Sequence, residues 1–251
     1  MVITNTSDFI NGLFSFLVFA ITVFVGISVM LRYMVNKQKI YLYWGMFFIG
    51  MYSPWWGGGL SFLSALIFNV PLSDQMYLLV MNVQVPIVYT CYWLGFTELF
   101  FKDKRKQILI VVSVFLLIVQ VYFYSMMVLD YTALGQLMSS IDPDSSPFDI
   151  KLKPLMLIFL LLESFSISIS GLYFSYTSIK SGNEEVKKRG YIALYVFIMY
   201  PTIGIIDGGL DLSDVTLIIV RTILISAAIM VYLGFGYSIK KSKRKMEKNR
   251  T

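Results

Sequence analysis

Two opposite charges lie inside long apolar segments of the chain, and they are the strongest candidates for chemistry. Glu163 lies in the apolar segment 154–179, and Arg221 lies in the apolar segment 214–239. Both are at a similar depth when their segments are built as helices that rise about 1.5 Å per residue. A charge inside a membrane span is costly and marks a functional site by default. We predict that the two residues form either a ligand or ion site or a buried pair that fixes helix register.

Other polar and aromatic residues fall in the same layer of the apolar segments. The candidates for this ligand-binding or buried polar layer, besides Glu163 and Arg221, are Asn82, Gln84, Tyr200, Asp207, Trp55 and Trp56. The run SPWWGGG at 53–59 and the prolines Pro86 and Pro201 predict helix breaks or bends nearby. Irregular backbone at membrane depth is tolerated only where it is buried in protein or lines water. The layer therefore predicts an outward-facing polar cavity with aromatic walls.

The residue types of the chain argue against catalysis. There is no histidine, and Cys91 is the single cysteine. The commonest general base and the usual metal and haem ligand are therefore missing, and a cysteine cluster is excluded. There is also no glycine pattern of the kind that binds nucleotides. We predict that the protein is not an enzyme and has no catalytic residues, no metal site and no cofactor.

The elements that hold these residues must be membrane-spanning helices. Hydrophobic residues make up 57% of the sequence and charged residues 14%, whereas a soluble domain is about 25% charged. This composition excludes a soluble globular protein and a nucleic-acid-binding domain. A spanning helix needs about 20 mostly apolar residues, and seven segments qualify: 9–34, 41–68, 76–101, 107–128, 154–179, 190–206 and 214–239. The predicted fold is an all-α seven-transmembrane-helix bundle, one domain over 1–239, followed by a basic tail over 240–251.

The basic residues predict how the bundle is threaded. Nearly all of the 21 lysines and arginines lie in the tail or in the loops after the first, third and fifth segments. With seven spans these regions share one side, which is the cytoplasm under the positive-inside rule. The N-terminus is then outside and the C-terminus cytoplasmic, in a multi-pass protein of the cell membrane. The tail suits contact with anionic lipid headgroups of the bilayer.

Small residues on one segment predict close helix packing. They recur at helical spacing along 154–179, as Ser164, Ser168, Gly171, Ser175 and Ser178. Such a stripe lets a second helix approach closely within a membrane.

The seven predicted spans and the Tyr200-Pro201 pair in the sixth resemble the microbial rhodopsins. That resemblance implies retinal held on a lysine in the seventh helix. The segment 214–239 contains no lysine, and the first one that follows is Lys240. Since a Schiff base needs an amine, the sequence argues against a retinal pigment.

Three functions fit the predicted topology. The first is a receptor or sensor that binds a small ligand from the outer side and signals through a separate cytoplasmic partner. The second is a small transporter or an ion or proton channel, with Glu163 as a relay. The third is a structural or assembly subunit of a larger membrane complex, in which the interior polar residues are structural.

Overall fold

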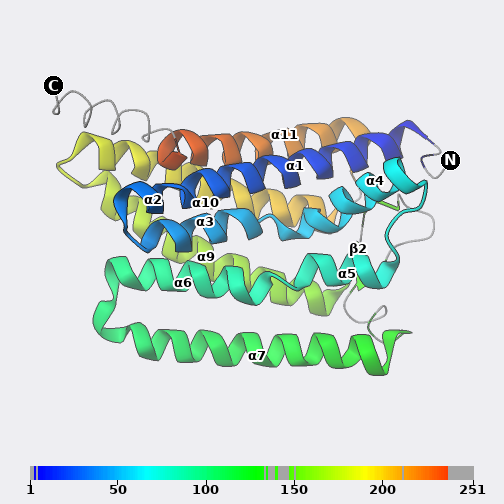
Figure 1. Ribbon diagram of the computed structural model, residues 1–251, viewed down its shortest axis with the longest axis horizontal. Helices are drawn as coiled ribbons and strands as arrows, with labels where there is room; N and C mark the ends of the chain where they lie inside the picture. The colour runs from blue at the N-terminus through cyan, green and yellow to red at the C-terminus, as the bar shows by residue number, and fades with distance from the viewer. Residues whose placement is uncertain are drawn as a thin grey trace.

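The protein is a bundle of helices whose long axes run side by side (Figure 1). The computed structural model describes residues 3, 5–132, 134, 139–140, 147–149, 151–210 and 212–236. The predicted basic tail, 240–251, lies outside the described residues. The bundle confirms the predicted all-helical class, apart from one pair of two-residue antiparallel strands, β1 (Ser139–Ser140) and β2 (Lys151–Leu152).

Most of the bundle is made of uninterrupted helices that run its whole length. They are α1 (Thr6–Met30), α7 (Arg105–Leu129), α9 (Pro154–Ile179), α10 (Glu184–Gly209) and α11 (Asp214–Val231). Side-chain caps set the start of three of them, because each cap accepts a backbone N–H that the first turn leaves without a partner. The caps are Asn5 for α1, Asn183 for α10 and Ser213 for α11.

Two further passages through the bundle are broken near their middle. The first consists of α3 (Ile40–Gly50), the 3-10 turn η1 (Ser53–Trp55) and α4 (Trp56–Phe68). The second consists of α5 (Asp74–Asn82) and α6 (Val85–Phe100). Pro54 and Pro86 lie at these breaks, where the missing proline N–H prevents a regular helix from continuing. Pro201, by contrast, lies inside the continuous helix α10.

Short elements complete the description. They are α2 (Arg32–Asn36), the 3-10 turn η2 (Lys102–Lys104) and the π-helical turn η3 (Tyr232–Gly236). The turns around α2, η2 and the α9–α10 connection lie together at one end of the bundle (Figure 1). We call this the basic end, since it carries Lys37, Lys39, Lys102, Lys104, Lys180 and Lys187. The other end, the N-terminal end, carries the start of α1 and the α4–α5 connection.

The multi-pass membrane architecture follows from the helices themselves. Among the described residues, six helices have the length and apolar composition needed to cross a membrane: Thr6–Asn36, Asp74–Phe100, Lys102–Leu129, Pro154–Ile179, Glu184–Gly209 and Asp214–Gly234. The predicted segment 41–68 is not among them, because the break after Gly50 divides it into shorter helices. Large apolar side chains, such as Val111 and Phe165, are well exposed on the outward faces, as lipid contact requires.

A cluster of aromatic rings fills the half of the bundle next to the basic end. Trp44 and Phe47 of α3 meet Tyr92 of α6 and Phe197 of α10, with ring centroids 4.7–6.4 Å apart. We call these four residues the aromatic core. A Cβ on Gly171 would lie 2.3 Å from the ring of Phe197. At this position the predicted small-residue stripe of α9 is therefore confirmed as the reason α10 can approach so closely.

Candidate functional site

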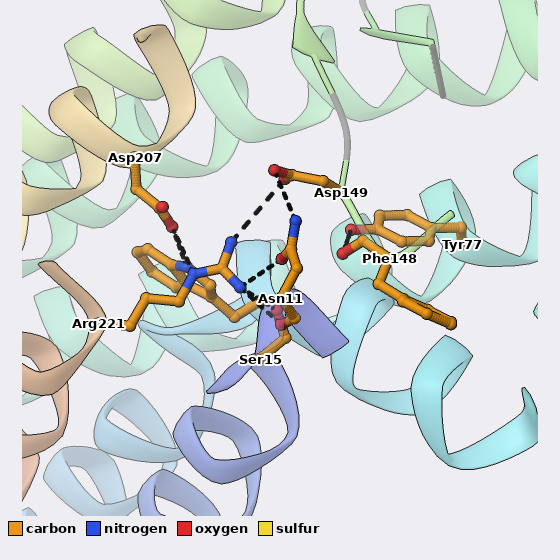
Figure 2. Close-up of polar contacts among 8 residues, drawn as sticks. Asn11, Ser15, Tyr77, Phe148, Asp149, Asp207 and Arg221 are labelled. Carbon is orange, nitrogen blue, oxygen red and sulfur yellow. Dashed lines mark hydrogen bonds and ion pairs between the residues drawn. The ribbon is translucent and has the colours of Figure 1, made fainter. Parts of the chain in front are cut away.

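The side chain of Arg221 is the centre of a buried polar network. It is 1% exposed and extends from α11 toward α1 and α10. Its Nη1 donates to the Asn11 carbonyl oxygen at 2.8 Å, to Asn11 Oδ1 at 2.5 Å and to Ser15 Oγ at 2.7 Å. Its Nε donates to Asp207 Oδ2 at 3.3 Å. Figure 2 shows these contacts converging on one guanidinium, which ties the first, sixth and seventh predicted spans together.

A short stretch of chain, Pro147, Phe148 and Asp149, covers the network at the N-terminal end. We call these three residues the lid. The Asn11 amide donates to Asp149 Oδ2 at 3.1 Å, and Arg221 Nη2 lies 3.9 Å from Asp149 Oδ1 (Figure 2). The second distance is an ion pair and is too long for a hydrogen bond. Asp149 therefore holds the outermost nitrogen of Arg221 only by charge.

The lid is anchored by its backbone and by one ring. The Tyr77 hydroxyl donates to the Phe148 carbonyl oxygen at 3.4 Å. The Phe148 ring is 1% exposed and packs edge-on against Phe62 of α4, with centroids 5.5 Å apart. Gly58 leaves room for this arrangement, because a Cβ there would lie 2.4 Å from the Phe148 carbonyl oxygen. The glycine run predicted to break a helix thus serves as the seat of the lid.

Beneath the lid is a cavity of about 40 Å³, which we call the outer cavity. Trp55, Tyr77 and Tyr200 supply its aromatic walls, and Asp207 and Arg221 its charges. The Trp55 indole N–H donates to Asp207 Oδ2, the same oxygen that accepts from Arg221. With two carboxylates around one guanidinium, the ionised network has a net negative charge.

A second cavity, of about 60 Å³, lies deeper and adjoins the first. We call it the inner cavity. Its polar lining includes Glu163 of α9, Gln120 of α7 and Asn82 of α5. The two cavities share several lining residues, which are Pro54, Met81, Leu160, Ser164 and Tyr200. These shared residues form the boundary between the two cavities.

The structure sorts the predicted site residues into four groups. Arg221, Asp207 and Trp55 line the outer cavity, Glu163 and Asn82 line the inner cavity, and Tyr200 lines both. Gln84 and Trp56 line neither. The Gln84 amide donates to the Met81 carbonyl oxygen at 3.2 Å, and the Trp56 ring packs edge-on against Phe19.

The predicted pairing of Glu163 with Arg221 is corrected by the structure. The two ion-pair partners that Arg221 has among the described residues are Asp207 and Asp149. The predicted pairing rested on depth along each helix alone. Depth could not show that α10 brings Asp207 closer to Arg221, or that the lid reaches into the bundle.

Sequence reasoning missed four residues of the Arg221 network and the two cavities. Asn11 and Ser15 lie one helical turn apart in the first apolar segment, so their polarity and spacing were a usable signal. Gln120 interrupts a long apolar run in α7 and was detectable in the same way. Asp149 had no such signal, because a carboxylate in a loop is normally solvated.

The groups at this site are ones that bind ligands through charge, hydrogen bonds and ring contacts. Within the described part of the chain, no group of three or more His, Cys, Asp or Glu side chains could hold a metal ion. What the site offers is a buried guanidinium, carboxylates and aromatic walls beneath a lid. No protein family, curated protein or solved structure matches this chain.

Proposed function

We propose that the protein is a membrane receptor or sensor that binds a small ligand in the outer cavity and signals through a separate cytoplasmic partner. One observation carries this proposal: the lid residue Asp149 lies against the buried Arg221 at a distance too long for a hydrogen bond. Exchanging this contact for a ligand would also break the bond from the Asn11 amide to Asp149, but it would leave the bonds from Arg221 to Asp207, Asn11 and Ser15 in place.

The ligand that this exchange favours carries an anionic group. A carboxylate that replaced Asp149 at Arg221 Nη2 would leave the charge of the network unchanged and would gain a charge-assisted hydrogen bond. Trp55, Tyr77 and Tyr200 would contact its apolar part. Because the outer cavity is only about 40 Å³, the ligand is small, and its entry requires the lid to move.

The aromatic core supports a sensor over a channel. Its rings lie between the cavities and the basic end. A ligand would therefore reach both cavities from the N-terminal end of the bundle. A sensor also needs two conformations with different affinities for the ligand. We propose that the breaks at Pro54 and Pro86 allow the outer halves of those passages to move while the aromatic core stays packed.

For the membrane topology, we propose that α3, η1 and α4 together make one crossing, which gives seven in all. The basic end then faces the cytoplasm of the cell membrane under the positive-inside rule. The lid and the outer cavity face outside, and the basic tail contacts anionic headgroups. In this orientation, a ligand reaches Arg221 from the N-terminal end.

Native mass spectrometry of the protein, extracted in mild detergent from its own membrane, tests the proposal. We expect the wild type to retain a small anionic molecule and Arg221→Ala to lose it. Asp149→Asn should raise its occupancy, because the competing carboxylate is gone. Glu98→Gln is the control, since Glu98 pairs with Arg105 and Lys102 at the basic end.

Two results of that experiment would contradict a receptor. One is equal occupancy in the wild type and Arg221→Ala. The other is a stable complex with other membrane chains and no small molecule, which favours an assembly subunit. Transport is the second candidate, because the two cavities adjoin, and flux into liposomes is its measurement.

A further inference from the structure

The inner cavity contains a carboxylate that has no counter-charge among the described residues. Glu163 lines this cavity from α9, and the structure gives its carboxylate no ion pair among the described residues. The nearby cation, Arg221, is already engaged by Asp207, Asn11 and Ser15. A membrane interior favours a carboxylate only when a positive charge or a proton compensates it.

Gln120 supplies a second, independent sign that something is bound in the inner cavity. Its side chain comes from α7 and is only 8% exposed. Its carbonyl oxygen Oε1 is buried and has no hydrogen-bond partner within the described part of the chain, and Gln120 lines the same cavity as Glu163. Buried polar atoms in native proteins are nearly always satisfied by protein, water or an ion. An unpartnered oxygen and an unpaired carboxylate that line one cavity are groups that a positive ligand would satisfy.

The broken helices add neutral oxygens to the same lining. In a regular helix, residues 54 and 86 would donate to the carbonyl oxygens of Gly50 and Asn82, but both positions are proline. Gly50 and Asn82 line the inner cavity. Backbone carbonyls released by helix breaks are typical ligands for monovalent cations within membranes. The hydroxyls of Ser53 and Ser164 are buried in the same lining.

We propose that the inner cavity binds a monovalent cation of the sodium class, held by Glu163, Gln120 and the released carbonyls. One carboxylate neutralises one positive charge. Divalent ions demand more, because calcium takes six to eight oxygen ligands and magnesium keeps a strict octahedral shell. A volume of about 60 Å³ accommodates the ion together with a few waters, since one water needs roughly 10–15 Å³. This proposal does not rest on the receptor function.

The route to this site is through the outer cavity. The residues that separate the two cavities include Tyr200, Met81 and Ser164. The net negative network of Arg221, Asp207 and Asp149 favours a cation on this path. On the opposite side, the packed rings of the aromatic core begin at Phe47, which lines the inner cavity. The ion is therefore expected to exchange with the medium at the N-terminal end only.

The test is thermal unfolding of the full chain in detergent, with sodium chloride replaced by choline chloride at constant ionic strength. Choline carries the same charge as sodium, but its methyl groups prevent oxygens from coordinating it. We expect a saturable rise in Tm with sodium, because a ligand that binds only the folded state stabilises it by mass action. Glu163→Gln should abolish the rise. Gln120→Leu, which keeps the carboxylate, should raise the half-saturating sodium concentration about tenfold.

Glu98→Gln is the matched control, because it removes a carboxylate that is already paired outside the cavity, and it should keep the full sodium response. Equilibrium binding of radioactive sodium to the wild type gives a second readout that does not depend on unfolding. No saturable sodium effect in the wild type, or an unchanged effect in Glu163→Gln, would overturn the proposal. If Glu163→Gln does not fold, Gln120→Leu decides the question. A sodium affinity equal to that of the wild type in this variant would also overturn the proposal.

Discussion

At the scale of single residues, the two acidic partners of Arg221 differ in burial, and this difference sets what each contributes to stability. The Asp207 side chain is 6% exposed and lies 3.3 Å from Arg221 Nε. The Asp149 side chain is 41% exposed and lies 3.9 Å from Nη2. Breaking a buried pair leaves an uncompensated charge, whereas an exposed pair is screened by water.

We therefore predict unequal losses when each carboxylate is removed. Asp207→Ala should lower the free energy of unfolding by about 3–5 kcal/mol. Asp149→Ala should lower it by at most about 1 kcal/mol. Denaturant unfolding of the two variants in the same detergent measures both values. Equal losses would mean that the lid carboxylate is held as tightly as the buried one.

At this scale, the sequence predicted which charged residues lie inside the bundle more reliably than it predicted which residues pair with them. Arg221, Asp207 and Glu163 stand out because polar residues are rare in apolar segments. Their pairing depends on helix rotation and on a loop that folds back into the bundle, and neither leaves a pattern in the sequence. Asp149 is the clearest case, because the lid alone makes it part of the site.

At the scale of elements, the seat of the lid depends on a single missing methyl group. A Cβ on Gly58 would lie 2.4 Å from the Phe148 carbonyl oxygen and 3.0 Å from Ser15 Oγ. The backbone carbonyl cannot rotate away as a side chain can, so the lid itself must shift. A substitution at Gly58 can therefore change the position of the lid without replacing any of the charged residues beneath it.

Gly58→Ala is predicted to unseat the lid without changing any polar group. Hydrogen exchange at the amides of Phe148 and Asp149 should become faster, because these residues lose their fixed position over Asn11 and Tyr77. Gly209→Ala is the control, since a Cβ there meets nothing within 4 Å. Exchange rates in Gly58→Ala that match those of the control would show that the lid does not rest on Gly58.

The sequence predicted which segments are helical more accurately than it predicted where each helix begins, ends or breaks. The expected sixth segment, 190–206, is part of the longer helix Glu184–Gly209. The first turns of this helix are polar and are capped by Asn183. A prediction from hydropathy alone therefore places the start of the helix too late in the sequence. The expected third segment, 76–101, is divided at Val83 and Gln84, beside the proline that sequence reasoning had taken for a bend.

At the scale of the whole molecule, the basic residues distinguish one end of the bundle from the other. Gln38 lies in the α2–α3 connection at the basic end, and Val70 lies after α4 at the other end. These two positions therefore bracket the broken passage of α3, η1 and α4. Their placement on opposite sides of a membrane is what a seventh crossing requires.

Single cysteines at these positions test the crossing in a Cys91→Ser background. We expect Val70→Cys to react with a membrane-impermeant maleimide on intact cells, since the Val70 side chain is 60% exposed. Gln38→Cys should react only after the membrane is permeabilised. Labelling of both cysteines in intact cells would show that the passage is not a crossing and that the topology has an even number of spans.

The Arg221 network also has a consequence for how the protein is made. It joins Asn11, near the start of α1, to a residue that is synthesised 210 positions later. Ribosomes deliver α1 to the membrane first, so Asn11, Ser15 and Asp207 must wait there until α11 arrives. The contacts of Asn11, Ser15 and Asp207 with Arg221 can therefore form only after α11 has been made, so the site is completed at a late stage of synthesis.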